Sequence, residues 1–207
     1  MKLDAEASTR ERIAQVALDL FAKHGFDGAS MRQIAGALGL RASSLYNHFP
    51  SKNAIFAELI ESYGPANSAS RLASPVYLAL KHDPEAFCRK YAADLLDQWC
   101  DPREQRFMEL LTAERNRLAG ERDHFFDTLF SREVGAITDY FRGFALTGAI
   151  HAPDPRECAS LLMAGLTFLR MEHFLITAQP SPRAVVGEAL DRLLGNFLAL
   201  VAPRGPP

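Results

Sequence analysis

The chain has 207 residues, of which 48% are hydrophobic, so it can bury one larger or two smaller cores and is not a disordered chain. The formal net charge of −2 and a pI near 6.3 would argue against nucleic-acid binding if the charge were spread evenly. It is uneven: residues 8–53 hold six basic and three acidic residues, a net +3, which leaves −5 for the rest of the chain. A local basic face of this kind is what phosphate contact requires.

Neither a membrane span nor a signal peptide is expected from the sequence. No run of about 18 apolar residues occurs, and the beginning MKLDAEAS lacks the apolar region of a secretory signal. We therefore expect a cytoplasmic protein with no membrane partner. The cysteines Cys88, Cys100 and Cys158 are odd in number and widely spaced, which favours reduced, mostly buried thiols. A redox role for one of them stays open.

The first 65 residues predict short helices, because strand-like alternation is absent and helix starts are frequent. Ser8 with Glu11, and Ser30 with Gln33, each have the spacing of a capping box. Gly25 is placed to end the first helix in a left-handed conformation. The predicted helices are 8–25, 31–38, 41–49 and 51–63.

Longer helices are predicted beyond residue 65. Pairs of a capping residue followed by proline indicate where they begin. These pairs are Asp83-Pro84, Asp101-Pro102, Asp154-Pro155 and Ser181-Pro182. The predicted helices are 67–80, 84–100, 102–118, 122–147, 155–178 and 182–201.

Helices 31–38 and 41–49, joined by a turn at Gly39-Leu40, have the spacing of a helix-turn-helix, whose second helix enters a major groove. In that second helix the apolar residues are three and four positions apart, so they share one face of the helix. We expect this face to be buried against the neighbouring helices. The members of this face are Ala42, Leu45 and Phe49. The opposite face presents Arg41, Ser43, Ser44 and Asn47, with Tyr46 and His48 to one side. Small residues on this face allow close approach to base edges, and longer ones at its rim reach phosphates.

Residues 9–60 resemble the DNA-binding domain of TetR-family (tetracycline-repressor-like) transcriptional regulators. The resemblance rests on FAKHGFDGAS at the end of the first helix, then MRQIAGALGL, then SLYNHFPSK. It implies an all-α fold with a helix-turn-helix domain over residues 1–51. It further implies a helical ligand-binding and dimerisation domain over residues 52–207.

The resemblance also assigns contacts with double-stranded DNA. Ser30, Tyr46, His48 and Lys52 would meet the phosphate backbone, which sets the register of the complex. The residues it implies at the DNA are Ser30, Arg32, Arg41, Ala42, Ser43, Ser44, Tyr46, Asn47, His48 and Lys52. A guanine for Arg41 and an adenine for Asn47 would each give roughly 1–3 kcal/mol of discrimination. The alternative for Arg41 is an ordinary solvated arginine.

In this family the second domain encloses a small-molecule effector, and an interior rich in aromatic and methionine side chains suits a hydrophobic one. The candidate ligand residues are Trp99, Met108, His124, Phe126 and Phe168. The family also pairs its last two helices with a second copy of the chain, which implies a homodimer through 155–178 and 182–201. The alternative is that these helices are buried within one chain.

Together these features predict a homodimeric regulator, usually a repressor, that binds a palindromic operator and responds to a ligand. No cofactor, metal site or catalytic residue is predicted. An enzyme is disfavoured because the sequence has no Gly-rich phosphate loop, no Gly-x-Ser-x-Gly and no HExxH. A DNA-binding protein without an effector remains a second alternative.

Overall fold

The computed structural model describes residues 8–63, 70–114 and 131–203, and these are helical without any strand, which confirms the all-α prediction. The chain divides into two compact units. We call the first the head; its described residues are 8–63 and 102–114. We call the second the bundle; its described residues are 70–101 and 131–203. Among the residues so described, no helix is both long and apolar enough to cross a lipid bilayer.

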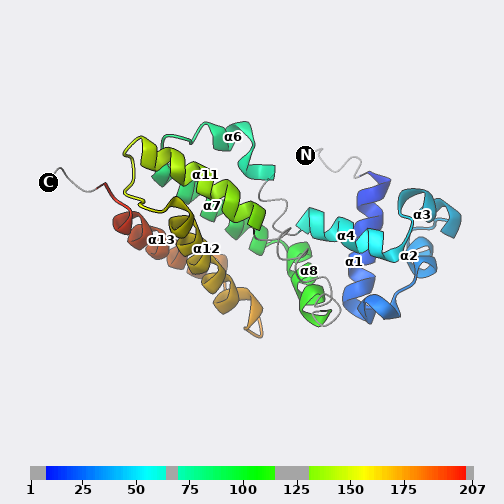
Figure 1. The fold of residues 1–207 in the computed structure, drawn as a ribbon. Helices are drawn as coiled ribbons and strands as arrows, with labels where there is room; N and C mark the ends of the chain where they lie inside the picture. The colour runs from blue at the N-terminus through cyan, green and yellow to red at the C-terminus, as the bar shows by residue number, and fades with distance from the viewer. Residues whose placement is uncertain (1–7, 64–69, 115–130, 204–207) are drawn as a thin grey trace, which may run out of the picture. The chain divides into compact units, whose positions relative to one another are not determined.

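The described residues of the head form five helices (Figure 1): α1 (Thr9–Gly28), α2 (Met31–Ala37), α3 (Ala42–His48), α4 (Lys52–Tyr63) and α8 (Pro102–Ala113). Both predicted capping boxes are confirmed. The Ser8 hydroxyl accepts from the Glu11 amide while the Glu11 carboxylate accepts from the Ser8 amide. Ser30 and Gln33 make the same reciprocal pair at the start of α2. These caps fix where α1 and α2 begin.

Gly25 kinks the end of the first helix. Its φ of 73° and ψ of 163° lie in a region that essentially only glycine occupies. The first regular helical segment is interrupted at Gly25, where a break was predicted, although ψ is extended and not that of a left-handed turn. A further short turn follows the kink, so that α1 as a whole runs to Gly28. The kink turns the chain so that Phe26, which is 3% exposed, packs back on Phe21 with ring centroids 5.1 Å apart.

The head has one apolar core to which all five helices contribute. Its fully buried members are Ile13, Ala17, Leu18, Phe21, Ile34, Leu45, Phe49, Ile55, Leu59 and Phe107. The compact units follow packing and place α4 and α8 with the first three helices, whereas the functional division between residues 51 and 52 stays a prediction. The physical reason is that α4 and α8 bury their apolar faces against α1, so both belong to the head.

The bundle consists of α6 (Pro75–Leu78), α7 (Pro84–Trp99), α11 (Arg132–Leu146), α12 (Pro155–Arg170), the π-helical turn η3 (Met171–Leu175) and α13 (Arg183–Leu200). Helix α11 packs on α12, and α13 packs on both α7 and α12 (Figure 1). Helix α13 lies close to Gly165 of α12, where an added Cβ would be 2.7 Å from Leu193 Cδ1. Gly165 thus serves packing within one chain.

Predictions for the bundle need several corrections. Helix 67–80 is broken at Ser74, whose extended conformation follows from the proline after it. Helix 155–178 changes to a π-turn at Met171 and ends at Leu175. Ser181 does not cap the last helix, because Pro182 takes the N-cap position. The segment 115–130, into which helices 102–118 and 122–147 were predicted to extend, lies outside the described residues.

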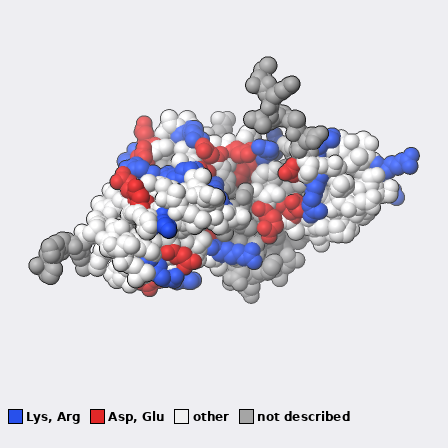
Figure 2. All heavy atoms as spheres, turned by 90° about the horizontal axis from the view of Figure 1, so that it is seen from above, with Lys and Arg blue, Asp and Glu red and all other residues white. Residues whose placement is uncertain are grey.

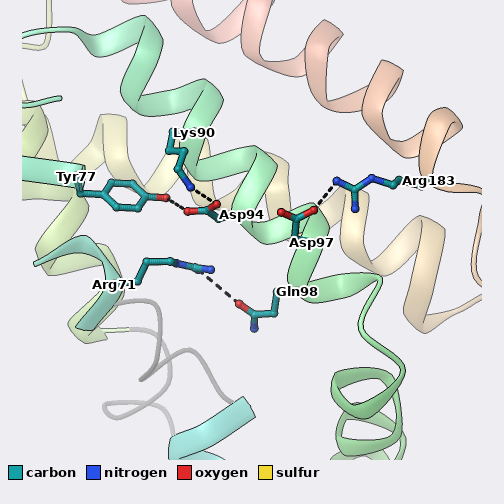
Figure 3. A network of polar contacts seen from close by, with 7 residues as sticks. All are labelled: Arg71, Tyr77, Lys90, Asp94, Asp97, Gln98 and Arg183. Atoms are coloured by element: carbon teal, nitrogen blue, oxygen red, sulfur yellow. Dashed lines mark hydrogen bonds and ion pairs between the residues drawn. The ribbon is translucent and has the colours of Figure 1, made fainter. Parts of the chain in front are cut away.

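Polar side chains on α7 tie neighbouring elements of the bundle together (Figure 3). The Tyr77 hydroxyl donates to Asp94 over 2.6 Å, and Lys90 pairs with the same carboxylate. Burial and this carboxylate raise the pKa of the Tyr77 phenol. Asp97 pairs with Arg183, the first residue of α13. The Tyr77 and Arg183 contacts connect α7 to α6 and to α13, and the Lys90 contact lies within α7. These polar groups therefore support the structure of the bundle.

The cysteines are free thiols. Burial raises the pKa of the Cys88 thiol to about 12, and burial together with Asp154 and Glu157 raises the pKa of Cys158. Redox chemistry proceeds through the thiolate, which a raised pKa disfavours.

Candidate nucleic-acid interface

Two large apolar side chains anchor helix α3 to the core of the head. Leu45 and Phe49 are both 0% exposed and lie in the head core, as their spacing predicted. Arg41 is the N-cap residue with extended backbone angles and makes no side-chain cap. A seven-residue helix has little stability of its own. Its position is therefore set by the two buried residues and by contacts at its ends.

The opposite face of α3 is polar and open to solvent. Arg41, Ser43, Tyr46 and Asn47 are exposed, whereas Ala42, Ser44 and His48 are half-buried. Tyr46 is a large aromatic residue that is nevertheless 52% exposed. Within the described ranges, the side chains of Arg41, Tyr46 and Asn47 have no hydrogen-bond or ion-pair partner. These groups can therefore meet another molecule without breaking an internal contact.

Ser30 and Arg32 lie at the start of α2. Both are exposed. The Ser30 amide and hydroxyl are engaged with Gln33 in the capping box, the amide over 2.8 Å. Since a capped helix start carries partial positive charge, this end of α2 is suited to an anion such as a phosphate.

The motif implies that Lys52 contacts a DNA phosphate, but in the structure its ammonium has internal partners. Its ammonium donates to the carbonyl oxygens of Phe26 and Ala29 over 2.5 and 2.8 Å. It also lies 4.4 Å from the centroid of the Phe26 ring. The ammonium therefore fastens α4 to the turn between α1 and α2. A phosphate contact by Lys52 stays a prediction, and only its remaining donor capacity is available for it.

Four other basic residues of the head are exposed and have no partner in the described part of the chain: Arg12, Lys23, Arg32 and Arg41. Figure 2 shows basic side chains standing out on a largely uncharged surface at the end of the view where α2 and α3 lie. Over the bundle, in the same view, basic and acidic groups alternate. The net +3 of residues 8–53 is balanced within the head as a whole, because its described residues hold eight basic and eight acidic side chains once the rest of α4 and residues 102–114 are included. Exposed basic residues without a described partner also occur in the bundle, at Lys81, Arg132, Arg156 and Arg192. The local positive charge therefore belongs to the segment 8–53 and not to the head as a whole.

The predicted ligand residues that the structure describes have different settings within their own units. Trp99 is buried in the bundle core, with its ring centroid 5.9 Å from that of Phe174. Met108 packs against the core of the head. Phe168 is 65% exposed on α12 and so faces outward. His124 and Phe126 lie outside the described residues. An effector site at these positions stays a prediction.

A groove of about 170 Å³ lies between α7 and α13. Its floor includes Leu96, Gly187 and Leu190, and the ion pair of Arg89 with Asp191, 3.4 Å long, lies at its edge. None of the three predicted ligand residues that the structure describes, Trp99, Met108 and Phe168, lines it.

Comparison with known proteins gives a family match in the N-terminal segment of the chain. A family model described as "Bacterial regulatory proteins, tetR family" matches residues 13–59. The transcriptional repressor KstR2 of Mycolicibacterium smegmatis is 35% identical over 57 residues, which are 28% of each chain. The mycofactocin biosynthesis regulator MftR of Mycobacterium tuberculosis is 43% identical over 49 residues, 24% of this chain and 25% of its own. These matches span about a quarter of the length of those relatives.

Solved structures match almost the whole chain. A TetR-family transcriptional regulator from Mesorhizobium loti has a TM-score of 0.76 at 24% identity, covering 93% of this chain and 96% of its own. The flavonoid-responsive regulator FrrA has a TM-score of 0.67 at 22% identity, covering 95% and 98%. At these identities the likeness concerns the fold. The segment 13–59 thus matches the TetR family of bacterial transcriptional regulators, and the chain as a whole shares the fold of solved TetR-family structures.

Proposed function

We propose that the protein is a ligand-responsive repressor that binds a palindromic operator as a homodimer and is released by a small hydrophobic effector. The observation that carries the DNA-binding part is the outer face of α3. Its exposed polar side chains have no internal partner in the described residues, while Leu45 and Phe49 beneath them are fully buried. A helix with one buried apolar face and one free polar face fits the second helix of a helix-turn-helix in a major groove.

We divide the proposed DNA-contacting residues into those that meet base edges and those that meet the phosphate backbone. Arg41, Ser43 and Asn47, which are exposed, are proposed to meet base edges, together with Ala42 and Ser44, which are half-buried. Tyr46, His48, Ser30, Arg32 and Lys52 are proposed to meet the phosphate backbone. Backbone contacts set the register of the helix in the groove, and base contacts set the preferred sequence.

An exposed apolar surface on the bundle supports the proposed homodimer. On α12, continued by η3, a stripe of apolar residues is exposed at alternating spacings of three and four residues. We call it the α12 stripe; its members are Leu161, Ala164, Phe168, Met171 and Leu175. This spacing is that of a helix seam that packs on another helix. A stripe of this kind favours burial against a second copy of the chain. The dimer would place its recognition helices in successive major grooves, about 34–36 Å apart.

Ligand response is supported by the aromatic core of the bundle, which is rich in the side chains that hydrophobic effectors contact. An effector can release DNA only if it binds better to a spacing of the two heads that does not fit the operator. The repressor role is supported by the curated relatives, of which KstR2 is named a repressor.

Duplex selection tests this proposal. The purified chain is mixed with a pool of duplexes that have a random core, retained duplexes are sequenced, and the winner is titrated at 50 and 200 mM salt. We expect two inverted half-sites about one helical turn apart. If each of the two heads makes two charged phosphate contacts, a plot of log affinity against log salt concentration should have a slope near −3.6. This slope corresponds to a loss of affinity of roughly 100-fold between 50 and 200 mM salt. Retention of no duplex, or a slope near zero, would contradict the proposal.

A further inference from the structure

We propose that Arg10, on α1, is a positioning residue that holds the C-terminal end of the recognition helix in place, and that Glu58 on α4 orients it. The inference rests on the proposed DNA-binding function. Neither residue was assigned a role by the sequence motif, and neither lies on the outer face of α3.

The Arg10 guanidinium contacts three elements of the head at once. Its Nη1 donates to the carbonyl oxygen of His48, the last residue of α3, over 2.9 Å. Its Nε and Nη2 both donate to Oε2 of Glu58, over 3.0 and 2.7 Å. Its central carbon lies 4.2 Å from the centroid of the Phe49 ring. One side chain thus joins α1, the end of α3 and α4. We call this set of contacts the Arg10 clamp.

The chemistry of the clamp requires an arginine. The last carbonyl groups of a helix have no partner within the helix, and a cation there also interacts favourably with the helix dipole. The planar guanidinium presents several donors in fixed directions, so it can serve a carbonyl and a carboxylate together while lying flat on an aromatic ring. A lysine ammonium is a single compact charge and does not reproduce that arrangement.

The clamp acts where precise placement is needed. Tyr46 and Asn47 directly precede His48, so an anchor at the His48 carbonyl fixes the residues that we place at the DNA. At Phe49 the chain leaves the helix with a φ of −138° and a ψ of 116°. Leu45 and Phe49 hold the underside of α3, and the clamp restrains rotation and tilt at its end. A set of binding side chains that is misplaced by about 1 Å contributes much less to affinity.

The competing explanation is that Arg10 contacts a DNA phosphate directly, since its side chain is 49% exposed. The two explanations predict opposite signs for Glu58. If only charge matters, removing this acid makes the head more positive and tightens DNA binding. If the clamp matters, removing Glu58 releases the guanidinium and weakens binding.

The experiment compares two pairs of variants in the full chain, using the duplex that the wild type selects. Arg10→Lys and Arg12→Lys both conserve charge on α1, but Arg12 is exposed and has no partner in the described residues. Glu58→Ala and Glu61→Ala both remove an acid from α4, and Glu61 is likewise exposed. We expect Arg10→Lys and Glu58→Ala to weaken binding roughly threefold to tenfold with an unchanged salt slope. Arg12→Lys should leave affinity unchanged, and Glu61→Ala should leave it unchanged or slightly tighter.

Hydrogen exchange without DNA gives a second readout. The Phe49 amide donates to the Leu45 carbonyl over 3.0 Å in the last turn of α3. We expect this amide to exchange roughly tenfold faster in Arg10→Lys and Glu58→Ala, because the end of α3 opens locally, and at the wild-type rate in both controls. Glu58→Ala that binds as tightly as Glu61→Ala, with unchanged exchange, would overturn the clamp alone. A wild type that selects no duplex would instead overturn the proposed function, and the positioning role with it.

Discussion

Replacing Leu45 with alanine is expected to lower the free energy of unfolding of the head by about 2–5 kcal/mol. Leu45 is 0% exposed and lies at the centre of the apolar face of α3. The substitution removes contacts with the other helices of the head and leaves a cavity. Because whole domains are stable by only about 5–15 kcal/mol, we also expect DNA binding to be severely reduced.

Urea denaturation followed by two signals measures this effect. Circular dichroism reports all helices, whereas the fluorescence of Trp99, the sole tryptophan of the chain, reports the bundle. In Leu45→Ala we expect part of the helical signal to be lost at lower urea than the fluorescence change.

The matched control is the neighbouring residue on the opposite face. Tyr46→Ala removes a side chain that is 52% exposed, so stability should change by no more than about 0.5 kcal/mol. Its affinity for all duplexes should nevertheless fall alike, because a backbone contact is lost. A Tyr46→Ala variant less stable than Leu45→Ala would show that α3 is seated with the wrong face inward.

Replacing Phe168 with aspartate is expected to convert the dimer to a monomer. Phe168 is 65% exposed in one chain and occupies the middle of the α12 stripe. In a dimer it would be desolvated, so the introduced carboxylate would be buried without a partner. The mass in solution should fall to that of one chain, 22.9 kDa. Affinity for the palindromic duplex should drop by roughly 100-fold or more, because the second head no longer binds as part of one molecule.

Leu146→Asp is the control for this substitution. Leu146 ends α11, is 82% exposed and is not part of the α12 stripe. It should leave both the mass and the affinity unchanged. If Phe168→Asp keeps the wild-type mass and Leu146→Asp loses it, the proposed dimer surface is wrong.

Local features of the fold were predictable from the sequence. The two capping boxes involve residues three positions apart, so the sequence alone contains the whole interaction. The buried face of α3 follows from the spacing of Leu45 and Phe49, because side chains three and four apart share a helix face. The break at Ser74 also has a local cause in the sequence, because proline at position 75 restricts the residue before it to extended conformations.

Features that depend on how helices meet were not predictable in this way. Arg10 and Glu58 are 48 residues apart, and their meeting depends on the crossing of α1 and α4. The inward direction of Lys52 depends on the kink at Gly25, which turns the carbonyls of Phe26 and Ala29 toward it. Phe168 faces outward on a helix that is apolar around much of its surface, so periodicity could not identify its buried side.

The central claim is that the outer face of α3 reads DNA sequence, and the base preference of an Asn47→Ala variant tests it most directly. Duplex selection is repeated with the variant and the wild type in parallel, and the preference at each position is compared. We expect preference to be lost at one base pair in each half-site, with a loss of roughly 1–3 kcal/mol of discrimination there and none elsewhere. An Asn47→Ala variant that selects the same sequence with the same stringency at every position would contradict the claim.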